Sequence, residues 1–305
     1  MSLTKINSNS SETIITNSST ISLLFQQMRP KQWTKNLLVF AALIFSPEVM
    51  NFENLGKSIF GFFLFAFVSS CVYIINDYVD READSKHPKK RYRPMASGAL
   101  NPNTALTFGV LLLIGSLVVS FNLNPLLSVL LLTYFILNVA YSFKLKHVVI
   151  IDVMIIALGF VFRAIAGGLV IDVPFTPWFL ICIMLLSLFL AISKRRHELT
   201  LLESSKGEHR KVLESYSPTL LDQLNSIVIS ATIISYSLFT FTSGHTIHLM
   251  WTIPFVIYGV FRYLYLIHIE NKGGSPEKVL LEDKPILFTV FLYVISVIII
   301  LGVFE

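Results

Sequence analysis

The chain has 305 residues, of which 54% are hydrophobic and only 14% are charged. Because soluble globular proteins contain about 25% charged residues, this composition excludes an ordinary soluble enzyme and indicates a polytopic membrane protein. The net charge of +5 does not indicate nucleic-acid binding, since the basic residues lie between hydrophobic runs. Cys71 and Cys182 both lie inside such runs, with neither disulfide nor metal-site spacing.

The chain begins with a polar segment, rich in Ser, Thr and Asn, that lacks the pattern of a signal peptide. We expect residues 1–22 to form a disordered cytoplasmic tail and residues 23–305 to form one all-α transmembrane domain. In chain order, apolar runs predict nine spans, at residues 31–48, 56–77, 103–121, 125–143, 149–171, 176–193, 221–243, 249–268 and 285–304. The first is the weakest because Lys31 and Lys35 leave only a short apolar run, which tilting of the helix or snorkelling of the lysines would accommodate.

The basic residues predict the orientation of these spans. With the N-terminus inside, every Lys and Arg except Lys57 and Arg163 falls in a cytoplasmic segment or near the cytoplasmic end of a span. Segments rich in Lys and Arg stay on the cytoplasmic side of a membrane. We therefore expect a multi-pass plasma-membrane protein whose site, described next, lies on the cytoplasmic face.

Three carboxylates follow the second apolar run, in the sequence Asn76-Asp77-Tyr78-Val79-Asp80-Arg81-Glu82-Ala83-Asp84. On one continuous helix, at about 100° per residue, Asp77, Asp80 and Asp84 would fall within about 60° of one another, while Glu82 would project away. Three acids on one face repel each other unless a cation lies against them. The simpler alternative is a solvated helix end.

A basic loop follows the acids, from His87 to Gly98, and contains Lys89, Lys90, Arg91 and Arg93. Carboxylate oxygens suit Mg²⁺, which also takes phosphate oxygens from a substrate. Lys and Arg side chains neutralise the remaining phosphate charge. The acids and the loop together therefore predict a Mg²⁺-bridged diphosphate site, although a cytoplasmic position alone explains any single Lys.

These residues resemble a known family. The pattern Asn76-Asp77-x-x-Asp80-x-x-x-Asp84, the later Arg93-Pro94-x-x-Ser97-Gly98 and the nine spans are similar to the UbiA superfamily of intramembrane prenyltransferases, over nearly the whole chain. The resemblance implies a UbiA-like bundle of nine transmembrane helices with a cytoplasm-facing active-site cavity. It also implies that Asp77, Asp80 and Asp84 form the catalytic Mg²⁺ site, with Asp84 either a third ligand or a residue just behind the other two. Asn76 would hydrogen-bond the substrate or a metal-bound water.

The chain departs from the usual family pattern at the end of the sixth span. Members that prenylate aromatic rings carry a second acidic motif there, usually D-x-x-x-D. This chain instead reads Ser193-Lys194-Arg195-Arg196-His197-Glu198-Leu199. Three cations in place of acids argue against a second Mg²⁺ site for a prenyl diphosphate and favour a site for a bare phosphate.

Three further stretches resemble one branch of the family, the polyprenyl-phosphate phosphoribosyltransferases, whose best-known member uses decaprenyl phosphate. They are Arg29-Pro30-Lys31-Gln32-Trp33-Thr34-Lys35-Asn36, Tyr141-Ser142-x-x-Leu145-Lys146 with Asp152-Val153, and Ser275-Pro276-Glu277 with Asp283. This resemblance implies transfer of 5-phosphoribose from 5-phosphoribosyl-1-diphosphate (PRPP) to a polyprenyl phosphate, with release of diphosphate, in cell-envelope polysaccharide precursor synthesis. The attacking lipid phosphate is already anionic at neutral pH, so no strong general base is required.

The resemblance and the residue types together suggest roles for the other candidates. The candidates for binding the PRPP phosphates are Lys90, Arg91 and Arg93. Those for the lipid phosphate or the ribose 5-phosphate, which the sequence does not divide, are Lys31, Lys35, Lys146, Lys194 and Arg195. Asp152 would pair with Lys146 or touch a ribose hydroxyl, and Tyr141 would line the pocket unless it is an interfacial belt residue. Arg163, deep in the fifth span, is either a structural clamp or part of the site.

Two other functions are consistent with parts of the sequence. A UbiA-type prenyltransferase would move a prenyl group from prenyl diphosphate to an aromatic or other small acceptor, but the missing second acidic motif argues against it. A membrane transporter would explain the charges at positions 152 and 163, but it would not require three acids on one helix face. The sequence leaves polyprenyl chain length and homo-oligomer formation open.

Overall fold

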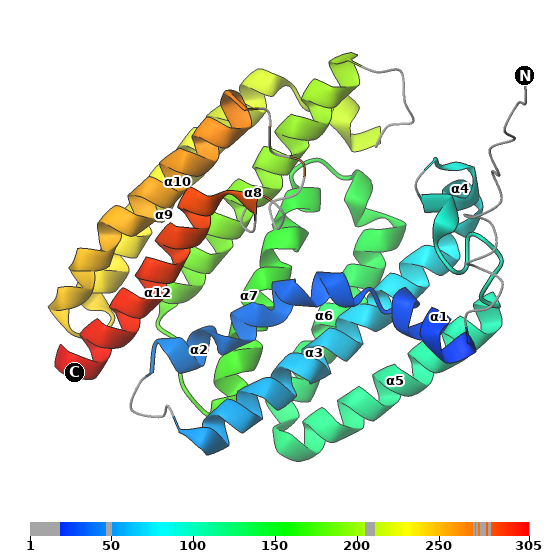
Figure 1. The fold of residues 1–305 in the computed structure, drawn as a ribbon, viewed down its shortest axis with the longest axis horizontal. Helices are drawn as coiled ribbons and strands as arrows, with labels where there is room; N and C mark the ends of the chain where they lie inside the picture. Colours follow the sequence, from blue (N-terminus) through cyan, green and yellow to red (C-terminus); the bar gives the residue numbers. More distant parts are fainter. Residues whose placement is uncertain are drawn as a thin grey trace, which may run out of the picture.

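The computed structural model describes residues 19–46, 51–88, 90–204, 211–270, 272, 274, 279 and 282–304. Within that part of the chain every regular element is a helix (Figure 1). Of the predicted tail, residues 1–18 lie outside the described residues, and helix α1 (Thr20–Gln27) begins inside it. The all-α prediction is therefore confirmed for the described residues.

Among the described residues, eight helices are long and apolar enough to cross a membrane. They are α3 (Phe52–Val79), α5 (Pro102–Leu123), α6 (Pro125–Phe143), α7 (Ile151–Ile171), α8 (Pro177–Ser204), α9 (Pro218–Thr242), α10 (Ile253–His268) with the preceding 3₁₀-helix η6 (Ile247–Thr252), and α12 (Lys284–Phe304). They correspond to the second to ninth predicted spans. In α5, α6 and α9 the first residue is proline, where its missing N–H costs little. The residue before each proline caps the helix with its side chain; these caps are Asn101, Asn124 and Ser217.

The first predicted span, residues 31–48, has a different form. Its described part is a 3₁₀-helix, η1 (Pro30–Phe40), followed by the short helix α2 (Ala41–Ile44). A 3₁₀-helix rises about 2.0 Å per residue, so η1 extends farther than an α-helix of equal length. It packs against α3 and α7, and Gly167 allows this close approach, since a Cβ atom there would lie 2.0 Å from the Val39 carbonyl oxygen. The predicted count of nine spans is not confirmed.

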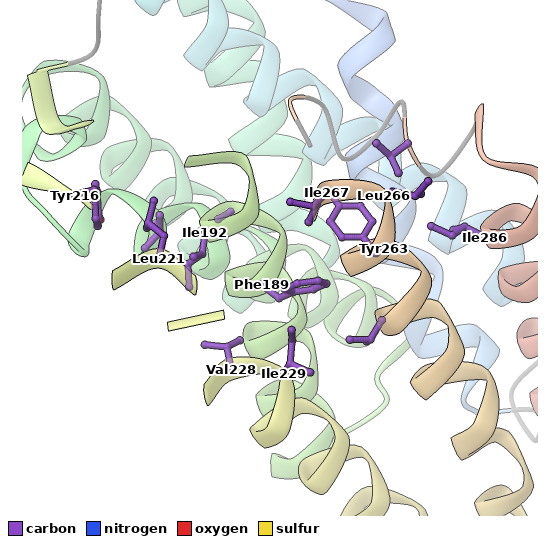
Figure 2. Close-up of a cluster of buried hydrophobic side chains, with 14 of the residues drawn as sticks. Phe189, Ile192, Tyr216, Leu221, Val228, Ile229, Tyr263, Leu266, Ile267 and Ile286 are labelled. Atoms are coloured by element: carbon purple, nitrogen blue, oxygen red, sulfur yellow. The ribbon is translucent and has the colours of Figure 1, made fainter. Parts of the chain in front are cut away.

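The long helices pack mainly against their neighbours in sequence, from α5 through α9, while α3 packs on α5 and α12 packs on α10. Figure 1 shows α3, α5 and α6 on one side of the molecule and α9, α10 and α12 on the other, with α7 and α8 between them. Figure 2 shows the core of the second side, where Phe189 of α8 lies against Tyr263 of α10 with ring centroids 5.3 Å apart. Large apolar side chains are exposed on α5, α6 and α12, as expected for helices that contact lipid.

The alternating directions of the helices gather the motifs at one end of the bundle. There α3 ends and α5 begins, α6 ends and α7 begins, and α8 ends and α9 begins (Figure 1). We call this end the site end. The fold thus brings the three acids Asp77, Asp80 and Asp84, the basic loop after them and the charged end of α8 to the site end.

Candidate functional site

Asp77 lies in the last turn of α3 and is buried, with 2% of its surface exposed. Three side chains donate hydrogen bonds to its carboxylate. Gln27 Nε2 donates to Oδ2 at 2.6 Å, and Arg93 Nη1 donates to Oδ1 at 2.9 Å. Arg29 Nη2 also donates to Oδ1. Because desolvation disfavours a buried charge, these donors are what allow an anion to be held at this position.

The prediction that the three acids share one continuous helix is wrong. Helix α3 ends at Val79, the chain turns at Asp80, and the short helix α4 (Arg81–Lys86) carries Asp84. Asp80 is partly exposed, and its Oδ1 lies 3.7 Å from Lys146 Nζ on the 3₁₀-helix η4 (Leu145–His147). The turn therefore separates Asp80 from the other two acids and directs it toward a cation of its own.

Arg93 joins the two remaining acids. Its Nη1 atom donates to Asp77 Oδ1 and also to Asp84 Oδ2. Asp84 is 3% exposed, and its Oδ1 lies 3.6 Å from Lys90 Nζ. Two carboxylate oxygens from two different helices thus converge on a single cationic atom. This convergence is the main geometric feature of the site.

The pair of acids fits a divalent metal ion that is shared with a phosphate ligand. In the part of the chain that the structure describes, no three acidic, His or Cys side chains are grouped closely enough to hold a metal by themselves. Mg²⁺ does not require such a group, because it commonly binds one or two carboxylates and takes its other oxygens from water and substrate phosphates. Asp77 and Asp84 supply two hard oxygen donors that already meet at one point.

A cavity of about 220 Å³ lies beside Asp77. The cavity lies between the end of α1 and the segment at the end of the 3₁₀-helix η3 (Lys90–Tyr92). Its lining residues are Gln26, Gln27, Arg29, Asp77, Tyr92, Arg93 and Pro94. Arg29 has a left-handed backbone, with φ at 54°, which is uncommon for a residue other than glycine. Two arginines beside a small cavity suit a phosphorylated ligand, because guanidinium groups bind phosphate through paired hydrogen bonds.

The sequence did not identify Gln27 as a site residue, and it pointed to Arg29 only as part of a motif. A signal for Arg29 existed, since a basic residue just before the first span is expected on the same side of the membrane as the acids. No pattern singles out Gln27. Its contact with Asp77 depends on the packing of α1 against α3.

The other predicted residues are spread over the site end. Lys90 and Arg93 lie with Asp77 and Asp84, and Lys146 lies with Asp80. Arg91 is exposed, and its guanidinium lies over the ring of Tyr92 instead of facing the acids. Lys31 is also exposed. Four further predicted site residues are half-buried: Lys35, Asn76, Tyr141 and Lys194.

Asp152 and Arg195 form a separate buried pair. Asp152 is 0% exposed and Arg195 is 2% exposed. Arg195 Nε donates to Asp152 Oδ2 at 2.8 Å, and Arg195 Nη1 donates to Glu198 Oε2 at 2.6 Å. The predicted pair between Asp152 and Lys146 is not observed, since Lys146 contacts Asp80.

The cations at the end of α8 are thus largely neutralised within the protein. Arg195 is held by Asp152 and Glu198, and Arg196 Nε donates to Asp222 Oδ1 at 2.5 Å. Arg195 would reach a phosphate only by leaving a buried carboxylate, which is unfavourable. Lys194, at the same helix end, is half-buried.

Tyr216 completes the buried pair and fixes the start of α7. Its hydroxyl donates to Asp152 Oδ1 at 2.7 Å and accepts from the Ile150 backbone N–H at 2.7 Å. Ile150 has a φ of 69°, a strained value for a β-branched residue, so this hydrogen bond stabilises a conformation that the chain does not otherwise favour. The pKa of Tyr216 is raised to about 12, mainly because the hydroxyl is buried and secondly because it donates a hydrogen bond to Asp152.

We expect this raised pKa to appear as a pH-dependent contribution to stability. Unfolded tyrosine has a pKa of about 10, so between roughly pH 10 and pH 12 the folded protein retains a proton that the unfolded chain has lost. The stabilisation is therefore complete below about pH 10 and is lost as the pH rises toward 12. The difference in unfolding free energy between the natural protein and Tyr216→Phe, measured in detergent micelles, should shrink across this range. A difference that stays constant across it would contradict the assignment.

Arg163 acts as a structural clamp in the middle of the bundle. Its Nε donates to Asn36 Oδ1 at 2.8 Å, Nη1 donates to the Gly159 carbonyl at 2.6 Å, and Nη2 donates to the Tyr134 hydroxyl at 3.0 Å. These contacts tie η1, α6 and α7 together. Its guanidinium also lies 5.1 Å from the ring centroid of Phe65, which adds a cation–π contact. Of the two roles that the sequence left open, the structure supports the clamp.

Comparison with known proteins agrees with these features. The family model described as the UbiA prenyltransferase family matches residues 37–295. A decaprenyl-phosphate phosphoribosyltransferase from Mycolicibacterium smegmatis is 36% identical over 281 residues, which cover 87% of this chain and 87% of that protein. One from Corynebacterium glutamicum is 34% identical over 271 residues, covering 86% of this chain and 81% of that protein. A solved structure of a UbiA homolog from Archaeoglobus fulgidus bound to DMAPP and Mg²⁺ has a TM-score of 0.70 at 18% identity, covering 92% of this chain and 100% of the other.

Proposed function

Because the chain belongs to the UbiA prenyltransferase family, we propose that it is a Mg²⁺-dependent phosphoribosyltransferase that moves 5-phosphoribose from PRPP to a polyprenyl phosphate and releases diphosphate. The observation that carries this proposal is the network in which Arg93 Nη1 bridges Asp77 and Asp84. The relatives named for this activity support it, since they match over most of their own length. The product is a precursor for cell-envelope polysaccharides.

The residues around Asp77 suit the diphosphate of PRPP. Asp77 and Asp84 would hold Mg²⁺, which would make the diphosphate a better leaving group. Arg29 and Arg93 both contact Asp77, so a diphosphate placed against the carboxylates lies within their reach. Their charge offsets the negative charge that builds up on the departing group, and Lys90 beside Asp84 adds a third cation.

The acceptor is a second anion, so the main task of the protein is to hold two anions close together. Its nucleophilic oxygen is already charged and needs no base. Lys146, next to Asp80, and Lys194, at the end of α8, are our first candidates for the lipid phosphate or the ribose 5-phosphate. Lys31 and Lys35 on η1 are further candidates, while Asp80 and Asn76 would contact Mg²⁺, its waters or the substrate. Tyr141 would line the pocket. Arg195 and Asp152 would act by positioning the end of α8.

The end of α8 distinguishes this function from aromatic prenyl transfer. That position holds Lys194, Arg195 and Arg196, and both arginines are paired with carboxylates. Residues 193–199 also lack the second D-x-x-x-D motif that aromatic prenyltransferases carry. The end of α8 is therefore a poor match for a prenyl diphosphate that is held by two Mg²⁺ sites.

We also propose the membrane arrangement that this chemistry needs. In it, η1 and α2 together form the first of nine spans, and residues 23–305 form a single domain in the plasma membrane. The site end faces the cytoplasm, where PRPP is available, and the Lys and Arg distribution supports that direction. A cavity open to the lipid would let the polyprenyl tail stay in the bilayer.

Donor selectivity tests the proposal. Purified protein in lipid nanodiscs that contain polyprenyl phosphate is expected to release diphosphate from PRPP, to stop when EDTA removes divalent cations, and to recover when Mg²⁺ is restored. A prenyl diphosphate offered with an aromatic acceptor is expected to give no diphosphate. Turnover of the prenyl diphosphate alone would overturn the proposal, and turnover of neither donor would favour a transporter.

A further inference from the structure

Gln27 has a fixed amide orientation and one unused polar atom. It is the last residue of α1 and is 1% exposed. Its Nε2 donates to Asp77 Oδ2 at 2.6 Å, and turning the amide over would place its oxygen against a carboxylate oxygen, where both atoms are acceptors. The oxygen, Oε1, is therefore the atom left over, and it is buried without a hydrogen-bond partner.

A buried acceptor without a donor is unfavourable and rare in folded proteins. Here it belongs to a side chain that lines the cavity beside Asp77. The two arginines in the same cavity wall, Arg29 and Arg93, already donate to Asp77. A ligand whose phosphate draws these arginines away from Asp77 would uncover the amide and would itself have to supply the donor.

The chemistry of the missing donor limits the class of ligand. Ionised phosphate oxygens are acceptors only, and a prenyl chain carries no polar hydrogen. A sugar hydroxyl is both small and a donor. The cavity also presents the hydrogen-bonding side chains of Gln26, Gln27, Arg29, Asp77 and Arg93, which can pair with the hydroxyl groups of a sugar ring.

We propose that Gln27 Oε1 accepts a hydrogen bond from a ring hydroxyl of the ribose in the donor substrate. Gln27 is then a specificity-determining residue, which favours sugar diphosphates over prenyl diphosphates because only a sugar satisfies the buried amide oxygen. This inference rests on the proposed function and adds to it the residue that recognises the sugar.

Removing the hydroxyl and removing the amide should have the same effect, and this equivalence is testable. Initial rates are measured in nanodiscs with PRPP, with its 2-deoxy analogue and with its 3-deoxy analogue, for the natural protein and for Gln27→Met. We expect the natural protein to prefer PRPP over one of the two analogues by about 10- to 100-fold in kcat/KM. Gln27→Met should lower kcat/KM for PRPP by a similar factor and should use PRPP and that analogue equally well.

Two controls separate hydroxyl recognition from general damage to the site. Inhibition by inorganic diphosphate, which has no hydroxyl, should weaken much less in Gln27→Met than turnover of PRPP does, because Arg29 and Arg93 still donate to Asp77. Gln223→Met makes the same chemical change at an exposed position on α9 and should keep the natural preference and rate.

The inference would be overturned if Gln27→Met kept the full preference for PRPP over both analogues. It would also be overturned if inhibition by diphosphate weakened in parallel with PRPP turnover, since Gln27 would then only support Asp77. If the natural protein used PRPP without discriminating either analogue, the role of Gln27 would fail while the proposed function stood. Turnover of a prenyl diphosphate instead of PRPP would remove both.

Discussion

Asp77→Asn is expected to lower kcat/KM by on the order of a thousandfold, the loss seen when a key electrostatic group is removed from an active site. The amide cannot balance Arg29 and Arg93, both of which donate to the natural carboxylate. It is also a weak ligand for Mg²⁺ compared with a charged oxygen. Diphosphate release from PRPP in nanodiscs measures the effect.

Asp222→Asn is the matched control for this variant. Asp222 is also an acid paired with an arginine at the site end, but its pair with Arg196 is partly exposed and lies outside the acid network. Exposed pairs contribute only about 0–1 kcal/mol, so activity and stability should stay close to those of the natural protein. The assignment of Asp77 would be contradicted if Asp77→Asn retained activity within tenfold while remaining folded.

Asp152→Ala is expected to reduce the free energy of unfolding by about 3–5 kcal/mol, because removing one partner leaves the other as an uncompensated buried charge. Arg195 would keep only Glu198, and Tyr216 would lose the acceptor for its hydroxyl. Denaturant unfolding in detergent micelles, followed by tryptophan fluorescence, measures the loss. The start of α7 and the end of α8 should be the regions most affected.

Two comparisons test the cause of this loss. Asp222→Ala breaks the partly exposed pair with the neighbouring Arg196 and should cost about 1 kcal/mol or less. The double variant Asp152→Leu with Arg195→Met removes both charges and should recover most of the stability. If Asp152→Ala were as stable as Asp222→Ala, the buried pair would not be the stabilising contact that the structure indicates.

The long apolar runs were sufficient to predict the eight long apolar helices from α3 to α12. A span in a bilayer must satisfy its own backbone hydrogen bonds, so length and composition predict its presence. They did not predict every end, since α8 continues to Ser204, beyond the predicted end at residue 193. The first span was harder, since Lys31 and Lys35 interrupt it and 3₁₀ geometry leaves no distinct pattern in the sequence. Its close packing on α7 depends on Gly167, a contact between segments far apart in the chain.

The acids and the basic loop were predicted as one site, and Asp77, Asp84, Lys90 and Arg93 do lie together. The turn at Asp80 was not predictable, because nothing in the run of acids breaks the helical pattern there. Charge counting also failed at the end of α8, where the sequence shows three cations but the fold supplies Asp152 and Asp222 from other helices. Pairing between distant residues depends on packing, which local patterns do not encode.

Mass spectrometry of the lipid product is the most direct test of the central claim. Membrane lipid extract, PRPP, Mg²⁺ and purified protein are incubated together, and the polyprenyl phosphates are compared with those from a reaction with Asp77→Asn. The account predicts a new lipid heavier by one phosphoribosyl group, formed only by the natural protein and only with PRPP present. A reaction that leaves the polyprenyl phosphates unchanged, while a prenylated aromatic product forms from added prenyl diphosphate, would contradict it.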